Sequence, residues 1–311
     1  MNRHGFVLAA TAATASMHAS RAGAQQLLNV RVATTPIDAG AQPFFAQSMG
    51  FFRSAGLNVT ITTISNGSAI AAAVASGAVD IGQSNVVSIA TAHERGIPFG
   101  LIAAGNLVVS RVHQAAAIVP NGSPIHTAKD LTGKTLAVNG LGTIPHVGAR
   151  AWVDQNGGDS NAVKYTEIPF TAMAVALDAG RIDCAFVSEP QLDDALASKH
   201  FRIIGYPYDA ISKEFLLGGW FTTAAWAKAN PEAVRAYAAA MRTTSRWANA
   251  NQSASGKILQ RETGIVVTPQ TTRVLFSDTL DANQIQPVLD ASAHYGVLKT
   301  SFPAAEIILT L

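Results

Sequence analysis

From residue 28 onward, short β-branched apolar runs alternate with Ala-rich helical runs, and this alternation leaves few possible folds. Most of the predicted helices end at a glycine, as helices often do. In the first stretch, strands are predicted at residues 30–33, 57–64, 79–82 and 99–103, and helices at residues 43–55, 68–76 and 86–95. Such a β-α-β-α-β series predicts a parallel sheet covered by helices.

The same pattern begins again at residue 114. Strands are predicted at residues 114–119, 135–138, 162–168 and 182–187, and helices at residues 146–156 and 172–179. The two stretches resemble each other at an offset of 103 residues, where IAAAVASGAVDIG lies opposite MAVALDAGRIDCA. Each copy has a helix, a glycine that ends it in a left-handed turn (Gly77, Gly180) and an aspartate entering a strand (Asp80, Asp183). We therefore expect two similar α/β lobes.

The last third of the chain has a different pattern. Residues 218–223 predict a strand that returns to the first lobe, and residues 231–250 a long amphipathic helix with Asn230 as N-cap. Further short helices are predicted at residues 253–262, 269–276, 282–295 and 304–309. Because no low-complexity linker occurs, we expect crossing strands to join the lobes. The predicted domains are lobe one, residues 25–113 and 218–311, and lobe two, residues 114–217.

Residues 1–24 have the layout of a secretory signal peptide. Arg3 precedes an apolar, Ala-rich stretch, and Ala22-Gly23-Ala24 fits a cleavage site after Ala24. The alternative is a frayed cytoplasmic N-terminus. No other segment approaches the 18 uninterrupted apolar residues of a membrane span, so we expect a periplasmic protein without membrane insertion.

Composition excludes several classes of protein. The chain of 311 residues is 48% hydrophobic and 14% charged, which suits two globular lobes. Without Arg3 and Arg21 of the predicted signal peptide, 20 basic residues face 20 acidic ones, so we expect no nucleic-acid partner. Cys184 is the single cysteine, which rules out an internal disulfide and predicts a core thiol.

Candidate binding residues lie in the loops that follow strands, because open α/β sheets bind ligands beyond the carboxyl ends of their strands. These loops are rich in Gly, Ser, Thr, Asn and Gln, and none carries Lys or Arg. They comprise residues 34–42, 65–68, 83–85, 139–143, 169–171 and 188–190. Their composition favours neutral hydrogen bonding.

Ser68 and Thr171 each open a helix at matching places in the two lobes. Free backbone N–H groups there can hold an oxygen of a sulfonate, carboxylate or nitrate, although plain N-capping is the alternative. One helix end contributes about 0.3–1 kcal/mol when exposed, whereas a micromolar ligand needs about 8 kcal/mol. Other hydrogen bonds and an apolar wall are therefore required, and the candidate wall residues are Phe44, Phe170, Trp220 and Phe221.

Three further residues have two interpretations each. His146 either donates to a ligand or begins a helix, and Glu189 either accepts from a ligand amine or pairs with a backbone N–H. Trp220 either stacks on a ligand or packs in the core. The sequence lacks the G-x-S-x-G, H-E-x-x-H and P-loop motifs, so we expect no catalysis, no metal and no cofactor.

Ordered motifs along residues 30–309 resemble the substrate-binding proteins of nitrate/sulfonate/taurine-type ABC importers, including pyrimidine-precursor-binding relatives. The motifs that carry the resemblance are GFF-x-x-x-GL-x-V at residue 50, SG-x-VD-x-G at 76, SPI at 123 with DL-x-GK at 130, AL-x-x-G-x-ID at 176, EP at 189 and YG with FP at 295 and 302. The resemblance implies an α/β, periplasmic-binding-protein-like fold of the twice-crossing type II, with hinges near residues 110–116 and 215–220.

The resemblance also implies a ligand groove between the lobes, with contacts from Ser68, Ser84, Asn85, Thr143, Thr171 and Glu189. Together with the strand-end loops, it gives a set of candidate ligand-binding residues: Thr35, Gln42, Asn66, Ser68, Ser84, Asn85, Asn139, Thr143, His146, Phe170, Thr171, Glu189 and Trp220. It implies a monomer that delivers a small molecule to an ABC permease in the inner membrane. The alternatives are an enzyme of the pyrimidine-precursor-synthase-like branch and a sensor domain that presents its ligand to a membrane protein.

Overall fold

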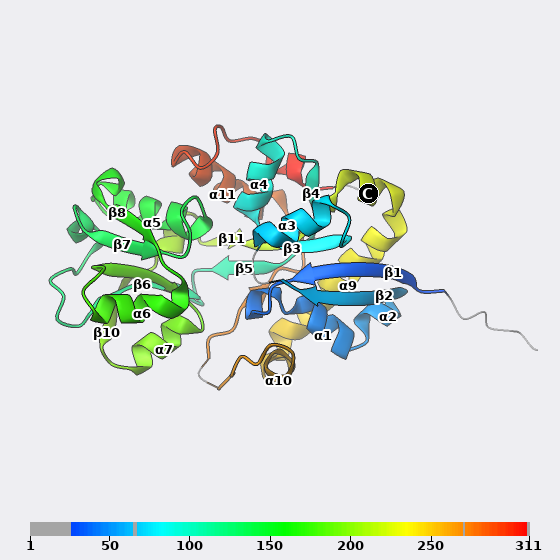
Figure 1. The fold of residues 1–311 in the computed structure, drawn as a ribbon, viewed down its shortest axis with the longest axis horizontal. Helices are drawn as coiled ribbons and strands as arrows, with labels where there is room; N and C mark the ends of the chain where they lie inside the picture. The colour runs from blue at the N-terminus through cyan, green and yellow to red at the C-terminus, as the bar shows by residue number, and fades with distance from the viewer. Residues whose placement is uncertain (1–25, 65–66, 270, 310–311) are drawn as a thin grey trace, which may run out of the picture.

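The computed structural model describes residues 26–64, 67–269 and 271–309. The predicted signal peptide and Asn66 lie outside these residues. A first sheet has the strand order β2-β1-β3-β12-β4, and we call this sheet with its helices lobe one (Figure 1). Its strands are β1 (Leu28–Thr34), β2 (Leu57–Thr63), β3 (Ile81–Asn85), β4 (Phe99–Ala104) and β12 (Gly218–Thr223). β1 pairs in parallel with β2 and β3, whereas β12 runs antiparallel to β3 and β4.

Four helices follow the early strands of lobe one, namely α1 (Gln42–Ser48), α2 (Phe51–Ser54), α3 (Gly67–Ala75) and α4 (Val86–Glu94). The single helix predicted over residues 43–55 is two helices, because Gly50 between them adopts the left-handed conformation with φ 73°. The strand predicted at residues 79–82 begins and ends later, so Ser84 and its neighbours belong to β3 rather than to a loop.

A second sheet has the strand order β10-β6-β9-β7-β8, and we call it with its helices lobe two (Figure 1). Its strands are β6 (Ala115–Pro120), β7 (Thr135–Val138), β8 (Lys164–Glu167), β9 (Cys184–Ser188) and β10 (Phe201–Gly205), and its helices are α5 (Ile144–Gln155), α6 (Phe170–Asp178) and α7 (Gln191–Ala197). β7 pairs in parallel with β8 and β9, whereas β6 is antiparallel to β9 and β10. Cys184 is fully buried, as predicted, and burial raises the pKa of its thiol.

The repeat seen in the sequence produces the same local structure in both lobes. Gly77 and Gly180 adopt positive φ values of 72° and 65° at the ends of α3 and α6. The Asp80 carboxylate accepts the backbone N–H of Arg31 at 2.7 Å, and the Asp183 carboxylate accepts that of Thr135 at 2.8 Å. In each lobe the aspartate therefore lies just before one strand, β3 or β9, and bonds to the neighbouring parallel strand, β1 or β7.

Two strands cross between the lobes. β5 (Asn106–Val109) follows β4 and leads to lobe two, and β11 (Glu214–Leu216) leads back to β12. They pair with β13 (Leu275–Phe276) in a three-stranded antiparallel sheet of order β11-β5-β13 that lies between the lobes (Figure 1).

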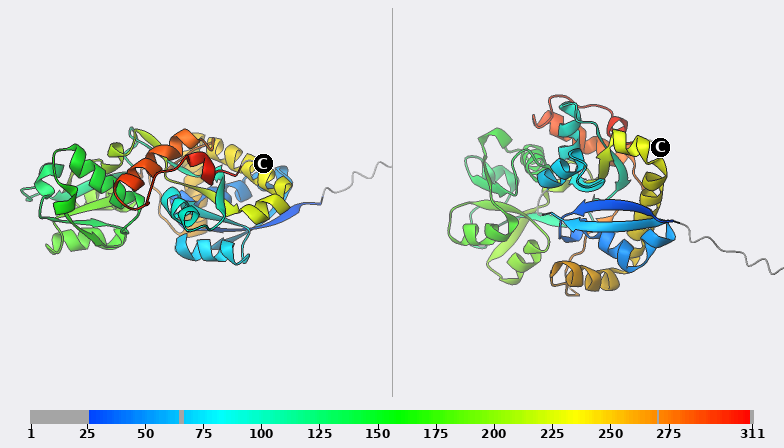
Figure 2. Two further views of the ribbon diagram at one scale, coloured as in Figure 1. Left: turned by 90° about the horizontal axis from the view of Figure 1, so that it is seen from above. Right: turned by 45° about the vertical axis from the view of Figure 1, so that its right-hand side comes forward.

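The C-terminal third consists mainly of helices: α8 (Ala224–Ala229), α9 (Pro231–Ala250), α10 (Gln252–Thr263) and α11 (Ala282–His294). The predicted helix at residues 231–250 matches α9. α11 contacts α4 of lobe one and α5 of lobe two, and so lies along the junction of the lobes (Figure 2). Within the described residues, no helix is long and apolar enough to cross a membrane.

The helix predicted at residues 269–276 is wrong. Leu275 and Phe276 pair with β5, and the backbone N–H groups of Thr272 and Val274 donate to Asp193 and Asp38. These tertiary partners replace the hydrogen bonds that a helix would have formed within itself.

Candidate functional site

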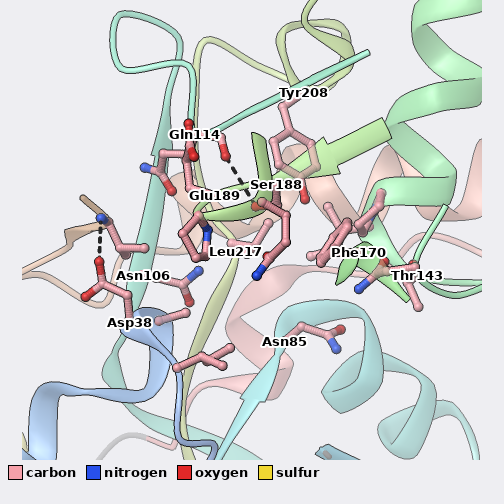
Figure 3. A pocket seen from close by; sticks show the side chains of 18 of the residues that line it. Asp38, Asn85, Asn106, Gln114, Thr143, Phe170, Ser188, Glu189, Tyr208 and Leu217 are labelled. Carbon is pink, nitrogen blue, oxygen red and sulfur yellow. Dashed lines mark hydrogen bonds between the residues drawn. The ribbon is translucent and has the colours of Figure 1, made fainter. Parts of the chain in front are cut away.

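A cavity of about 430 Å³ lies between the two lobes, in the size range of small-molecule sites (Figure 3). Loops from both sheets, the crossing strands and the segment after α10 all contribute to its wall. The lining residues are Pro36, Ile37, Asp38, Ala39, Asn85, Asn106, Gln114, Asn139, Thr143, Ile144, Pro145, Phe170, Ser188, Glu189, Pro190, Gln191, Tyr208, Leu217, Ile265 and Val274.

Lobe one contributes the loop after β1 and the end of β3. Asp38 is held by Arg273, whose Nε and Nη2 donate to its two carboxylate oxygens at 2.7 and 2.8 Å. Asn85 ends β3 and caps α4, because its Oδ1 accepts the N–H of Ser88 at 2.9 Å. Both side chains therefore have fixed positions at the wall.

Lobe two contributes the carboxyl ends of β7 and β9 and the beginnings of α5 and α6. Thr143 is the N-cap of α5, and its Oγ1 donates to the carbonyl oxygen of Gly140 at 2.6 Å. Phe170 is the first residue of α6, and Glu189 follows directly after β9. Figure 3 shows Thr143 and Phe170 side by side across the cavity from Asp38.

The crossing segments form a third part of the wall. Gln114 precedes β6, and its Nε2 donates to the carbonyl oxygen of Leu107 at 2.7 Å. Ser188 Oγ donates to the carbonyl oxygen of Gln114 at 3.2 Å. Asn106 begins β5, and its Oδ1 has no hydrogen-bond partner within the described part of the chain. A buried acceptor of this kind normally finds water or a ligand.

Glu189 is the carboxyl group at the cavity without a cationic partner among the described residues. Its Oε2 accepts the N–H of Asp193 at 3.0 Å. Burial raises the pKa of Glu189 to about 8, and the carboxylates of Asp193 and Asp194 contribute to the rise. At neutral pH this carboxyl group is therefore mostly protonated in the empty protein.

His146 does not line the cavity. It lies in the first turn of α5, its Nδ1 accepts the N–H of Gly142 at 3.1 Å, and its ring packs edge-on against Tyr165. Burial, together with the charge of Arg150, lowers the pKa of His146 to about 4. The ring is therefore neutral at physiological pH and stabilises the loop after β7.

Five of the candidate residues line the cavity: Asn85, Asn139, Thr143, Phe170 and Glu189. Four others, Thr35, Ser68, Ser84 and Thr171, lie in or beside the strand-end loops but do not line it. Ser84 is buried in β3, and its Oγ has no partner among the residues described.

Gln42 and Trp220 have a structural role instead. Both are fully buried, Trp220 Nε1 donates to Gln42 Oε1 at 2.7 Å, and Gln42 Nε2 donates to Ser245 Oγ at 2.9 Å. The expectation that Trp220 stacks on a ligand is therefore corrected, because its ring packs edge-on against Tyr237 inside lobe one.

Sequence reasoning did not select Asp38, Asn106, Gln114 and Tyr208. Asp38 lies in the loop of residues 34–42, which follows a predicted strand, and its negative charge would have been a reason to select it. Asn106, Gln114 and Tyr208 come from the crossing region, where no strand-end rule applies. Within the described residues, no group of His, Cys, Asp and Glu side chains could hold a metal ion.

The fold is that of known binding proteins. It matches the periplasmic aliphatic sulphonate binding protein SsuA from Escherichia coli with a TM-score of 0.73, 15% identity and coverage of 91% of this chain and 92% of that chain. The periplasmic nitrate-binding protein NrtA from Synechocystis PCC 6803 matches with a TM-score of 0.72, 13% identity and coverage of 90% and 84%. These matches confirm the predicted periplasmic-binding-protein-like fold class.

The alkanesulfonate-binding protein SsuA from Xanthomonas axonopodis pv. citri, bound to MOPS, matches with a TM-score of 0.70, 15% identity and coverage of 90% and 98%. No curated protein sequence matches the chain. The sequence model of the family described as NMT1/THI5 like matches residues 41–255, which is more than half of the chain. The chain therefore belongs to the NMT1/THI5-like family.

Proposed function

We propose that this protein is an extracytoplasmic solute-binding protein that delivers a small organic molecule to an ABC importer. The observation that carries the proposal is the cavity between the lobes, to which the strand-end loops of both sheets contribute. A ligand placed there contacts both lobes at once, so its binding energy favours the arrangement in which they lie close together.

Closure is the proposed mechanism, with residues 114–217 as the moving lobe. β5 and β11 are short crossing strands on which the lobes can rotate, and hinge closure around a ligand is common in two-lobed binding proteins. The difference in affinity between the open and closed forms sets the closed population. The closed form is the one that a permease would recognise.

The periplasm is the proposed location, and a monomer is the proposed state. The structurally similar SsuA from Escherichia coli and NrtA from Synechocystis PCC 6803 are periplasmic proteins, and the layout of residues 1–24 agrees with export. Binding without catalysis is supported by the hydroxyl of Ser188 in the cavity, because it donates to a backbone carbonyl rather than to a base.

A thermal-shift screen with amines, sulfonates, aromatic acids, pyrimidines and flavins, followed by small-angle X-ray scattering, tests this function. A specific ligand at 100 times its Kd should stabilise the protein by about 2.7 kcal/mol and reduce its radius of gyration. Phe170→Ala should weaken binding about tenfold by removing apolar contact area. Phe302→Ala, which changes a half-buried ring outside the cavity, is the matched control. The absence of any shift with every class would contradict the proposal.

A further inference from the structure

The ionisable side chains that line the cavity are acidic. Asp38 and Glu189 are both in its wall, and no Lys or Arg is among the described lining residues. The nearby Arg273 is 6% exposed, binds both carboxylate oxygens of Asp38, and also donates to the carbonyl oxygen of Gln252. Arg273 therefore neutralises Asp38 and has little capacity left for a ligand, whereas Glu189 has no such counter-charge.

The hydroxyl and amide groups around Glu189 mostly present acceptors. Gln114 Nε2, Ser188 Oγ and Thr143 Oγ1 each already donate to a backbone carbonyl oxygen. Their remaining capacity lies in the second N–H and the Oε1 of Gln114 and in the lone pairs of the two hydroxyl groups. Asn85 has the opposite arrangement, since its Oδ1 caps α4 and its Nδ2 can donate. Among these four side chains, the remaining lone pairs outnumber the remaining N–H groups.

The helix N-termini around the cavity have few free N–H groups that could bind an anion. The N–H of Ser88 at the start of α4 is taken by Asn85, and the N–H of Asp193 in α7 is taken by Glu189. Pro145 occupies the second position of α5 and has no N–H. Of the helix ends near the cavity, the start of α6 at Phe170 is the one without a side-chain cap or an internal proline.

Closure of the lobes would enclose the carboxyl group of Glu189, which has no cationic partner among the described residues. An ionised carboxylate that is enclosed without a partner is costly, and a bound cation removes that cost while gaining a charge-assisted hydrogen bond. Much of the wall is apolar, and Phe170, Tyr208, Leu217, Ile265 and Val274 are among its apolar members. A ligand that complements this wall has an apolar body and one protonated nitrogen.

We propose, on the basis of the solute-binding function above, that the cavity selects an organic cation of the ammonium or amidinium type, paired with Glu189, over sulfonates and nitrate. Besides the carboxyl of Glu189 itself, the titratable and charged groups around it are Asp193 and Asp194 on α7, Asp38 and Arg273 on the opposite wall, and Tyr208.

The protonation of Glu189 predicts a proton release that can be measured when a cation binds. Because the pKa of Glu189 is about 8, a cation that binds at neutral pH must displace the proton from this carboxyl group. Binding of a cation therefore releases a proton and tightens as the pH rises from 6.5 to 8.5. An anion that accepts a hydrogen bond from the protonated carboxyl group would weaken over the same range.

Isothermal titration calorimetry with probes that share one ring tests the inference. The probes are benzylamine, benzamidine, phenylmethanesulfonate and benzoate, with sodium nitrate as an inorganic anion, each at pH 6.5 and 8.5. Benzylamine or benzamidine should bind at least about tenfold more tightly than the sulfonate, the range expected for one hydrogen bond to a charged group. Glu189→Gln should weaken the cation by a similar factor and abolish the proton release.

Glu232→Gln is the matched control, because it makes the same chemical change at an exposed residue in the first turn of α9 that does not line the cavity. It removes one negative charge away from Glu189 and should leave binding unchanged. The pH dependence of the wild-type protein needs no variant, so the test does not depend on how Glu189→Gln folds. A sulfonate that binds as tightly as the amine at both pH values overturns the cation inference and leaves the solute-binding function in place. If probes of neither charge bind while a pyrimidine or a flavin stabilises the protein in the thermal-shift screen, the cation inference fails and the solute-binding function stands. If no class binds in either experiment, both proposals fail.

Discussion

Burial shifts two titratable side chains of lobe two in opposite directions, and both shifts favour the neutral form. The pKa of Glu189 rises to about 8 and that of His146 falls to about 4. Glu189 lines the cavity, whereas His146 lies behind it and holds the loop after β7 through Gly142. A shifted pKa alone therefore does not distinguish a binding residue from a structural one, and the position relative to the cavity does.

The shift at Glu189 predicts how stability depends on pH. An unfolded Glu loses its proton near pH 4.5, whereas the folded one keeps it up to about pH 8, so the free energy of unfolding falls as the pH rises through this window. Between pH 7 and 8.5, where an unfolded His146 with a pKa of 6.5 is mostly neutral, Glu189→Gln should remove most of this fall in urea unfolding. Glu232→Gln, at an exposed residue of α9, should retain it, and an unchanged slope in Glu189→Gln would contradict the assigned shift.

At the scale of elements, the stretch from Thr271 to Phe276 has little structure of its own and is positioned by other elements. Arg273 binds Asp38, the N–H of Thr272 binds Asp193, and β13 pairs with β5. The pair between Arg273 and Asp38 is almost fully buried and lies beside the cavity. This pair therefore fixes part of the wall as well as the segment.

Removing one partner of this buried pair should cost far more than removing both. Arg273→Met leaves the charge of Asp38 unpaired and should lower the free energy of unfolding by about 3–5 kcal/mol. The double variant Asp38→Asn with Arg273→Met should recover most of that loss in chemical denaturation. Arg261→Met is the control, since Arg261 forms an exposed pair with Glu262 that is worth under about 1 kcal/mol. Equal losses in the single and double variants would show that the segment is held by something else.

At the scale of the whole molecule, the lobes meet at the crossing sheet and also at the junction along α11. Arg150 of α5 donates to the carbonyl oxygen of Tyr295 at 2.8 Å, and its guanidinium lies 4.9 Å from the centre of the Tyr295 ring. This contact links lobe two to the C-terminal part of lobe one. The closure proposed above must keep or break this contact.

Arg150→Ala should loosen this junction. Hydrogen exchange followed by mass spectrometry should show faster exchange in α5 and in the peptide that contains Tyr295, because both sides lose a shared contact. The core strands β7 and β9 should exchange as in the wild-type protein. Lys228→Ala on α8, an exposed cation away from the junction, is the control. Faster exchange throughout lobe two would instead indicate that Arg150 stabilises the lobe itself.

The sequence by itself determined the local structure and the overall class. Alternating patterns predicted most strands and helices, and Gly77 with Asp80, repeated at Gly180 with Asp183, predicted two related sheets. These features depend on contacts between residues close in the chain, which leave a readable period. The strand-end rule also selected loops that line the cavity, and Asn139, Thr143 and Glu189 lie in these loops.

Only the tertiary structure decided which side chains of those loops face the cavity. Gln42 and Trp220 are 178 residues apart in the chain, yet they bond to each other in the core and so are removed from the site. Gln114 and Asn106 enter the site because the crossing strands pass behind it. The physical reason is that the direction of a side chain depends on packing against distant elements, whereas the period of a strand or helix depends on its neighbours.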